Sequence, residues 1–336
     1  MVIYIGNFLS KHGLTESLAE TFVRQLRTES IIINTASSKK NQILRILEMI
    51  YVCLKAKKKD LILIDTFSTK AFYFSLILGL ISKIKHVKYC PILRGGNLPI
   101  KLNNNLLAHL YFSNSYKIIA PSLYLSNPFS KKYNNVICIP NFIQIENYPF
   151  IHRTIGKPNL IWVRSFHETY NPLLVIDLVE ILIKDYPEIH IIMVGPDKDG
   201  TKLKFENEFK RNKLESNFTI TNKLEKKRWI ELSQKSSIFI NSTNFDNHPV
   251  SVIEAMALGL PVVSTNVGGV PYLIEDRING LLFEKGNHIA FANTIKELLV
   301  SPELMSKLSY NSRRSALNYD WKVVSCLWKE QIGEFY

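Results

Sequence analysis

The sequence has few cysteines and no arrangement of them that would support a disulfide framework or a zinc site. Four cysteines occur in 336 residues, and no two form a CxxC pair. They lie far apart among mainly apolar neighbours, at Cys53, Cys90, Cys138 and Cys326. Such spacing is typical of reduced, buried thiols in a cytoplasmic protein.

Long hydrophobic runs are also absent. The longest uncharged apolar stretch, 71–82, lies between Lys70 and Lys83 and is shorter than the about 20 residues that a membrane-spanning helix needs. Met1 leads directly into an apolar run, with no basic start or cleavage site typical of a secretory signal. We therefore expect a cytoplasmic protein that is at most peripheral at the inner face of the plasma membrane.

Acidic residues are scarce in the first half. Residues 1–150 carry 19 Lys/Arg and 7 Asp/Glu, whereas residues 151–336 carry 23 and 22. An imbalance of this size indicates that the first half faces something anionic, such as nucleic acid, acidic lipid or a lipid pyrophosphate. A lysine-rich proteome would produce the same imbalance without any anionic partner, so both interpretations stay open.

Motifs for binding dinucleotides, metal ions and nucleic acids are missing as well. No GxGxxG follows the first apolar run, which argues against an NAD-dependent oxidoreductase. No dense cluster of Asp and His is present to hold magnesium, and no nucleic-acid-binding motif occurs. The basic residues are spread over many predicted helices, which argues against a nucleic-acid-binding module.

What the sequence does contain is a regular alternation of short apolar runs and helical patterns, typical of doubly wound parallel sheets. Strands are predicted at 2–5, 31–34, 61–65, 87–93, 117–120 and 136–140, and after a break at 160–163, 189–194, 218–221, 238–241 and 261–264. Helices are predicted at 15–27, 42–58, 69–83, 104–113, 122–132, 172–185, 202–213, 226–235, 249–258, 289–299, 303–319 and 321–335.

The fold class is therefore expected to be α/β, with two Rossmann-like domains whose parallel sheets face a cleft. The proline- and glycine-containing segment 146–158 is predicted to be a linker. It would join an N-terminal domain of residues 1–145, completed by a C-terminal helix 321–336, to a C-terminal domain of residues 159–320.

The segment from Ile240 to Pro271 contains the most informative pattern. A strand is predicted to end near Ser242, and Pro249 suits the first turn of the helix that follows. The backbone amides of residues 247–251 would then form an anion site at the helix N-terminus. Gly259 is expected to end this helix, and Gly268-Gly269 is expected to let the backbone pass close to a ligand.

Glu254 lies inside this predicted helix, beside Ala255, Met256 and Ala257. A charge facing an apolar core would be costly, so a carboxylate here is better explained as accepting hydrogen bonds from ligand hydroxyls. The alternative is a solvated charge on the exposed face of the helix.

Residues 242–283 resemble the signature of the family-four retaining glycosyltransferases of the GT-B architecture. That signature combines two acids separated by seven residues with a run like Glu-Ala-Met-Ala-x-Gly-x-Pro-Val-Val and with Gly-Gly-x-Pro. The resemblance implies that Glu254 binds the nucleotide ribose and that Asp246, which replaces the usual Glu, binds the donor sugar. It places the donor diphosphate on the helix N-terminus, with donor-binding candidates Asn247, His248, Val250 and Ser251.

Other segments extend the resemblance. The loop Lys11-His12-Gly13 follows the first strand, where the family places a glycine-containing loop near the donor phosphates and acceptor. Arg94-Gly95 stands where relatives often have His-Gly touching the donor sugar. Arg164 matches the arginine of the family's phosphate clamp and suits bidentate phosphate recognition. Thr169 replaces the clamp lysine, and the nearest polar substitutes are Tyr170 and Asn171.

The resemblance implies a retaining, metal-independent transferase with no cofactor, for which a nucleotide diphosphate sugar is the donor substrate. A front-face displacement would need Arg164 and the helix N-terminus to stabilise the leaving diphosphate. The expected acceptor is a glycan or a lipid-linked oligosaccharide in cell-surface polysaccharide or lipopolysaccharide assembly. Alternatives are a nucleotide-sugar epimerase or hydrolase of the same fold, and a basic nucleic-acid-binding protein.

The predicted helix 42–58 has an apolar stripe and ends in lysines, including Lys55, Lys57 and Lys58. Such a helix can lie on an anionic membrane surface. It can equally pack against the protein core with a solvated basic end, and the sequence does not choose between the two.

Overall fold

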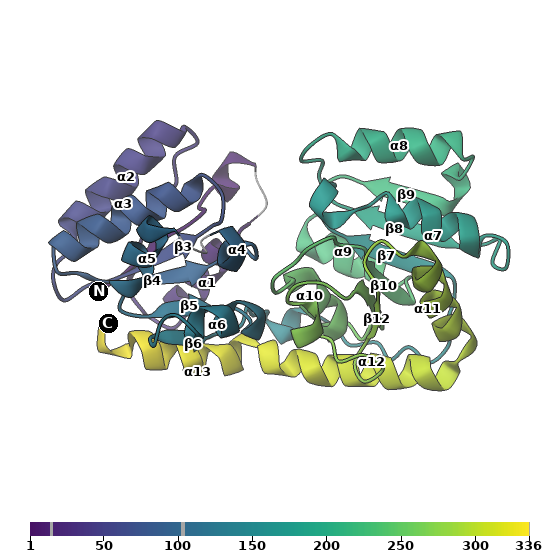
Figure 1. Cartoon of the computed structure of the whole chain (residues 1–336). Helices are drawn as coiled ribbons and strands as arrows, with labels where there is room; N and C mark the ends of the chain where they lie inside the picture. The colour runs from purple at the N-terminus through teal and green to yellow at the C-terminus, as the bar shows by residue number, and fades with distance from the viewer. Residues whose placement is uncertain (14–15, 102–104, 336) are drawn as a thin grey trace. The chain divides into compact units, whose positions relative to one another are not determined.

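The computed structural model describes residues 1–13, 16–101 and 105–335, which divide into two compact units. Unit 1 consists of residues 1–141 and 324–336, and unit 2 of residues 142–323. Each unit contains one six-stranded sheet with helices packed on it (Figure 1).

The sheet of unit 1 has the strand order β2-β1-β3-β4-β5-β6, and every pairing in it is parallel. Its strands are β1 (Val2–Ile5), β2 (Ile33–Ala36), β3 (Leu61–Thr66), β4 (Lys88–Leu93), β5 (Ile118–Ala120) and β6 (Val136–Cys138). Its helices are α1 (Leu18–Thr28), α2 (Gln42–Lys55), α3 (Ala71–Ile84), α4 (Leu98–Lys101), α5 (Leu106–Ser113), α6 (Leu123–Ser130) and most of α13 (Trp321–Ile332), with the short 3-10 helices η1 (Ser10–His12) and η7 (Gly333–Phe335).

Successive residues of β1 face opposite sides of this sheet. Ile3 and Ile5 belong to a core that also contains residues of α2, α3, α5 and α6. Tyr4 faces the other side, where its ring lies 5.5 Å from that of Phe22 in α1. Phe22 in turn packs 4.5 Å from Trp328 of α13. Helices therefore cover both faces of the sheet, which explains the continuous apolar runs of its strands.

The sheet of unit 2 has the order β12-β11-β10-β7-β8-β9 and is also parallel in every pairing. Its strands are β7 (Asn159–Val163), β8 (His190–Val194), β9 (Phe218–Thr221), β10 (Ile238–Asn241), β11 (Val262–Thr265) and β12 (Leu281–Phe283). Its helices are α7 (Leu174–Leu182), α8 (Thr201–Arg211), α9 (Lys226–Ser233), α10 (Val250–Ala257), α11 (His288–Val300) and α12 (Pro302–Ala316). The 3-10 helices η2 (Ile145–Asn147), η3 (Glu168–Tyr170), η4 (Glu215–Asn217), η5 (Val270–Tyr272) and η6 (Leu317–Tyr319) connect them.

Two hydrophobic cores flank this second sheet. Leu160 and Trp162 of β7 pack with residues of α7, α8 and α11, whereas Ile161 packs with residues of α9 and α10. The predicted fold class, two α/β domains with parallel sheets, is confirmed.

Several predicted boundaries differ from those of the structure. The helix predicted at 42–58 ends at Lys55, because the Asp60 carboxylate accepts a hydrogen bond from the Lys57 amide at 2.7 Å and closes a turn there. Strand β12 was not predicted, since three residues are too few to show a period. Three predicted helices extend beyond the described residues. Two of them start at residues 15 and 104, and the third ends at residue 336.

Residues 146–158 contain no helix or strand beyond the single turn of η2. They are nevertheless part of the packing of unit 2, because the Tyr148 and Arg153 side chains are buried. Across the residues that the structure describes, no helix has the length and apolar character needed to span a bilayer.

Candidate functional site

The candidate site is built at the carboxyl ends of β7 and β10 and at the start of α10. Strand β10 ends at Asn241, a polar loop follows, and Pro249 is the N-cap residue of α10. In the part of the chain that the structure describes, the amides of Val250 and Ser251 donate no hydrogen bond to the protein. Free amides at a helix N-terminus carry partial positive charge and favour an anion.

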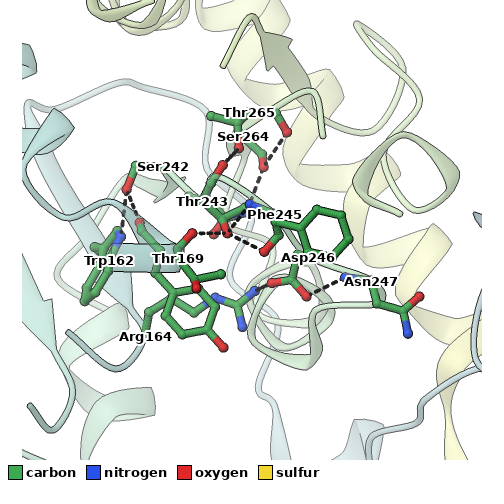
Figure 2. A network of polar contacts seen from close by, with 12 residues as sticks. Trp162, Arg164, Thr169, Ser242, Thr243, Phe245, Asp246, Asn247, Ser264 and Thr265 are labelled. Carbon is green, nitrogen blue, oxygen red and sulfur yellow. Dashed lines mark hydrogen bonds and ion pairs between the residues drawn. The ribbon is translucent and has the colours of Figure 1, made fainter. Parts of the chain in front are cut away.

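Arg164 and Asp246 lie against one another in this site. An Arg164 guanidinium nitrogen lies 2.5 Å from an Asp246 carboxylate oxygen, and their side chains are 13% and 15% exposed. The guanidinium also lies over the Tyr170 ring, 4.9 Å from its centroid. Figure 2 shows this pair, with Asp246 on the loop that follows β10. The two residues that the resemblance assigned to phosphate and to sugar are thus brought together.

A network of hydrogen bonds fixes the loop that carries Asp246 (Figure 2). The Trp162 indole donates to the Ser242 hydroxyl at 3.2 Å, and the Thr265 hydroxyl donates to the Thr243 carbonyl at 2.7 Å. Asp246 itself accepts a hydrogen bond from the Asn247 amide at 2.8 Å. The loop is therefore anchored to three strands, and Asp246 has little freedom to move.

Glu254 is 6% exposed, so the alternative of a solvated surface charge is wrong. One of its carboxylate oxygens accepts a hydrogen bond from the Tyr148 hydroxyl at 2.6 Å and lies 2.7 Å from the Lys226 ammonium nitrogen. Burial raises the pKa of Tyr148, and the Glu254 carboxylate raises it further, so this hydroxyl remains a donor.

Tyr148 and Lys226 were not identified from the sequence. Tyr148 lies in the segment predicted as a linker, and Lys226 is one of many lysines on predicted helix surfaces. The buried carboxylate at Glu254 was the only signal that could have indicated them, because a buried charge requires partners. Its second carboxylate oxygen has no protein partner in the described ranges.

The pair Gly268-Gly269 packs against the loop that carries Asp246. A Cβ atom at Gly269 would lie 1.6 Å from the Asn247 carbonyl oxygen, and one at Gly268 would lie 2.1 Å from that of Asp246. These glycines therefore let the backbone approach the Asp246–Asn247 loop, and their predicted close approach to a ligand stays a prediction. The prediction for Gly259 is confirmed, since its φ of 73° is the left-handed conformation that ends a helix.

Asn247 and His248 are both buried beside Asp246. Burial lowers the pKa of His248 to about 4, so this imidazole is neutral at pH 7. Its ring packs edge-on against Tyr319, with centroids 5.2 Å apart. A neutral ring adds no charge to the site.

The position of the missing clamp lysine is occupied by Thr169 in η3. The Thr169 carbonyl accepts hydrogen bonds from the Asn244 amide at 2.7 Å and from the Thr243 hydroxyl at 3.1 Å. Asn171 follows with φ 44° and caps η3. These residues position the loop around Arg164, and the only cation among residues 164–171 is Arg164 itself.

The candidates in unit 1 fall into two groups. Lys11 and Gly13 are exposed at η1, and a Cβ at Gly13 would meet no described atom within 4 Å. Arg94 is instead enclosed, donating to the Asp65 carboxylate at 2.7 Å, the Tyr4 hydroxyl at 2.8 Å and the Asn141 side chain at 3.1 Å. Gly95 packs against Ser68, where a Cβ would lie 2.7 Å from the backbone nitrogen.

Several buried polar atoms of unit 2 have no hydrogen-bond partner among the described residues. Two of them are Nε of Arg164 and the hydroxyl oxygen of Ser251. Buried donors without partners are rare, and each destabilises the fold unless a ligand or a water molecule accepts its hydrogen bond. Both belong to residues that the sequence assigned to diphosphate binding.

The chain is similar in sequence to known glycosyltransferases. The chain is 26% identical over 232 residues to an uncharacterized glycosyltransferase of Methanocaldococcus jannaschii, covering 68% of this chain and 63% of the relative. It is 30% identical over 151 residues to an uncharacterized glycosyltransferase of Haemophilus influenzae, covering 45% and 42%. The alignments thus span less than two thirds of the length of these relatives.

The solved structure of Anabaena HepE in complex with UDP-glucose is similar over 99% of both chains, with a TM-score of 0.76 and 16% sequence identity. This likeness confirms the GT-B fold. The sequence profile described as "Glycosyl transferases group 1" matches residues 144–315, just over half of the sequence. The chain therefore belongs to the glycosyl transferases group 1 family.

Proposed function

We propose that the protein is a retaining glycosyltransferase that transfers a sugar from a UDP-sugar to a hydroxyl acceptor. Unit 2 binds the donor and unit 1 the acceptor. The observation that carries the proposal is Glu254, a buried carboxylate one turn into α10, behind the open amides of Val250 and Ser251. Support for UDP comes from HepE, which shares the fold and was crystallised with UDP-glucose.

Each residue has a distinct role in this mechanism. The free carboxylate oxygen of Glu254 accepts hydrogen bonds from the ribose hydroxyls, while Tyr148 and Lys226 hold the other oxygen. Asp246 accepts hydrogen bonds from the donor sugar.

Charge develops on the diphosphate as it leaves, and preorganised donors stabilise such charge strongly. Arg164, the amides of Val250 and Ser251, and the Ser251 hydroxyl supply those donors. The acceptor hydroxyl attacks from the face that the diphosphate leaves, so the anomeric configuration is retained. No protein nucleophile takes part, and no metal is required because Arg164 and the helix supply the positive charge.

The Glu254→Gln substitution tests the donor assignment. Thermal-shift measurements with UDP, GDP, ADP and CMP are expected to show stabilisation of the wild type by UDP, in the presence of either EDTA or magnesium. Glu254→Gln should lose most of that shift. Tyr148 and Lys226 are both donors to one side-chain oxygen, so the glutamine amide nitrogen would take the place of the oxygen that faces the ribose, and this nitrogen cannot accept a ribose hydrogen bond.

Glu231→Gln is the matched control, since Glu231 lies on α9 in an exposed ion pair with Arg228. This control is expected to respond to UDP like the wild type. Equal UDP shifts in Glu254→Gln and wild type would refute the ribose assignment.

We further propose that unit 1 rests on an anionic membrane surface. The outer faces of α2 and α3, which pack together, expose large apolar side chains: Ile43, Leu44, Leu47, Tyr51, Leu54, Tyr73, Ile77 and Ile84. Lysines surround them at both ends of the two helices: Lys39, Lys40, Lys55, Lys57, Lys58, Lys59, Lys83 and Lys85. An apolar face bordered by cations complements an anionic bilayer, and it fits a lipid-linked acceptor.

Co-sedimentation with vesicles checks this surface. The wild type should bind phosphatidylglycerol vesicles and should bind phosphatidylcholine vesicles at least about tenfold more weakly. Replacing both Leu44 and Leu47 by glutamate should abolish the binding, whereas the same change at Leu203 and Leu317, two exposed leucines of unit 2, should not. Absence of wild-type binding to phosphatidylglycerol would contradict the proposal.

A further inference from the structure

Unit 1 contains a cavity of about 400 Å³ at the point where the strand order of its sheet reverses. β2 lies on one side of β1 and β3 on the other, and the segments that leave β1 and β3 both line the cavity. Ligands of open parallel sheets bind at such a reversal, outside the carboxyl ends of the strands. The first turns of α2 and α3 form the remaining walls, so every lining residue belongs to unit 1.

Two buried polar atoms of this lining have no hydrogen-bond partner in the described part of the chain. One is the hydroxyl oxygen of Ser37, a residue that is 1% exposed, and the other is Nε of Arg45. Ser37 also has a φ of 90°, a conformation that is strained for a residue other than glycine. Unpartnered buried donors and local backbone strain both occur at ligand sites more often than elsewhere.

The charge of the cavity is positive. Arg45 and Lys70 both line it, and neither forms an ion pair with an acid among the described residues. Asp65, the acid in the lining, is already bonded to the Tyr4 hydroxyl at 2.8 Å and to Arg94 at 2.7 Å. Arg45 donates from Nη2 to the Lys40 carbonyl at 3.3 Å, but no described carboxylate neutralises either cation. The remaining donors of the planar Arg45 guanidinium match the geometry of phosphate oxygens.

The lining also contains the uncharged polar residues Asn7, Gln42, Thr69 and Ser75, together with a group of large apolar side chains. Met49, Phe67, Phe74 and Leu78 form walls around the polar atoms. A ligand that places an anionic group near Arg45 would therefore have its uncharged portion against these side chains.

We infer that this cavity binds the phosphate group of a phosphorylated acceptor. Ser37 and Arg45 donate hydrogen bonds to the phosphate oxygens, and Lys70 contributes a second positive charge. The inference that the ligand is an acceptor substrate rests on the proposed transferase function, whereas the inference that the cavity binds phosphate does not. The phosphate belongs either to a lipid or to a soluble sugar phosphate.

Calorimetric titration of the full chain without nucleotide tests the inference. The probes are octyl phosphate, which has an apolar chain, and glucose 1-phosphate, which has none. Arg45→Ala is expected to weaken the binding of the recognised probe at least about tenfold, because it removes a charge-assisted hydrogen bond. Ser37→Ala should weaken binding about threefold without lowering the melting temperature, since its hydroxyl has no partner to lose.

Lys131→Ala is the control, because it removes one positive charge from an exposed lysine of the same unit that does not line the cavity. It should bind the probes like the wild type. Binding of octyl phosphate alone assigns a lipid phosphate, binding of glucose 1-phosphate alone assigns a soluble one, and binding of both assigns phosphate without further selection. Failure of both probes to bind, or equal affinities for wild type and Arg45→Ala, overturns the inference.

UDP titrated into the same samples separates this inference from the proposed function. Arg45→Ala should bind UDP as the wild type does, because Arg45 lies in unit 1 and the donor residues lie in unit 2. A wild type that binds a phosphate probe but no UDP would contradict the donor proposal and leave the cavity assignment intact.

Discussion

Arg164→Ala is expected to lower kcat/KM for the UDP-sugar by about 10²–10³-fold, the loss typical of removing a preorganised donor from a developing negative charge. The family has an arginine and a lysine in this clamp, whereas Arg164 is the one Lys or Arg in residues 164–171 of this chain. No neighbouring residue in the sequence can therefore supply the charge that Arg164→Ala removes. The substitution also leaves the Asp246 carboxylate, 15% exposed, without its cationic partner. An uncompensated carboxylate next to the diphosphate would repel it.

Arg164→Lys distinguishes charge from geometry. A lysine keeps the positive charge but loses the bidentate fork and the planar stacking over Tyr170. We expect it to recover less than about a tenth of the lost activity. Arg228→Ala is the control, because Arg228 is 65% exposed on α9 and, among the described residues, forms an ion pair with Glu231 alone. Steady-state kinetics on folded samples would refute the role of Arg164 if Arg164→Ala stayed within about threefold of the wild type.

Gly269→Ala is expected to destabilise unit 2 by more than about 3 kcal/mol, at the upper end of the cost of overpacking a rigid site. The added Cβ would lie 1.6 Å from the Asn247 carbonyl oxygen, which is backbone and cannot rotate away. The Gly269 amide also donates to the Asp246 carbonyl at 2.9 Å, so relief of the clash would break this bond and displace the Asp246 loop.

Thermal unfolding measures this effect, and the melting temperature should fall by at least about 6 °C. Gly333→Ala is the control, since a Cβ there would meet no described atom within 4 Å. The UDP-dependent thermal shift of Gly269→Ala should also fall, because the loop carries a donor-binding residue. A melting temperature within about 1 °C of the wild type would contradict the prediction.

Periodicity predicted the sheets well because both faces of each sheet are covered. Buried parallel strands such as β3 and β7 are continuous apolar runs, and their patterns stand out from the polar loops that follow. The ends of helices were predicted less well, since they depend on single side chains. Asp60 stops α2 three residues before the predicted end, and no periodic pattern contains that information.

The location of the site could be predicted because its backbone features are local in sequence. Pro249, Glu254 and Gly259 lie within eleven residues, and their spacing alone describes a capped helix with a buried carboxylate. The partners of that carboxylate could not be predicted. Tyr148 and Lys226 reach Glu254 from segments that are separated from it along the chain, and only the packed structure brings them within 2.7 Å. The same holds for Ser37 and Arg45, which carry no motif.

The packing of Trp328 against Phe22 has a consequence for the order of synthesis. Unit 1 includes residues 324–335, with Lys329 lying 2.7 Å from Glu29 and Lys117 donating to Gln331 at 2.7 Å. During translation these partners leave the ribosome between 214 and 306 residues apart, and synthesis of that length takes roughly 10–60 s. Unit 2 is therefore complete on the ribosome before unit 1 is, and the half of the protein made first is the last to acquire its full set of contacts. Until then α1 has the Phe22 ring without Trp328 to cover it, and a chaperone could bind the nascent chain at that point.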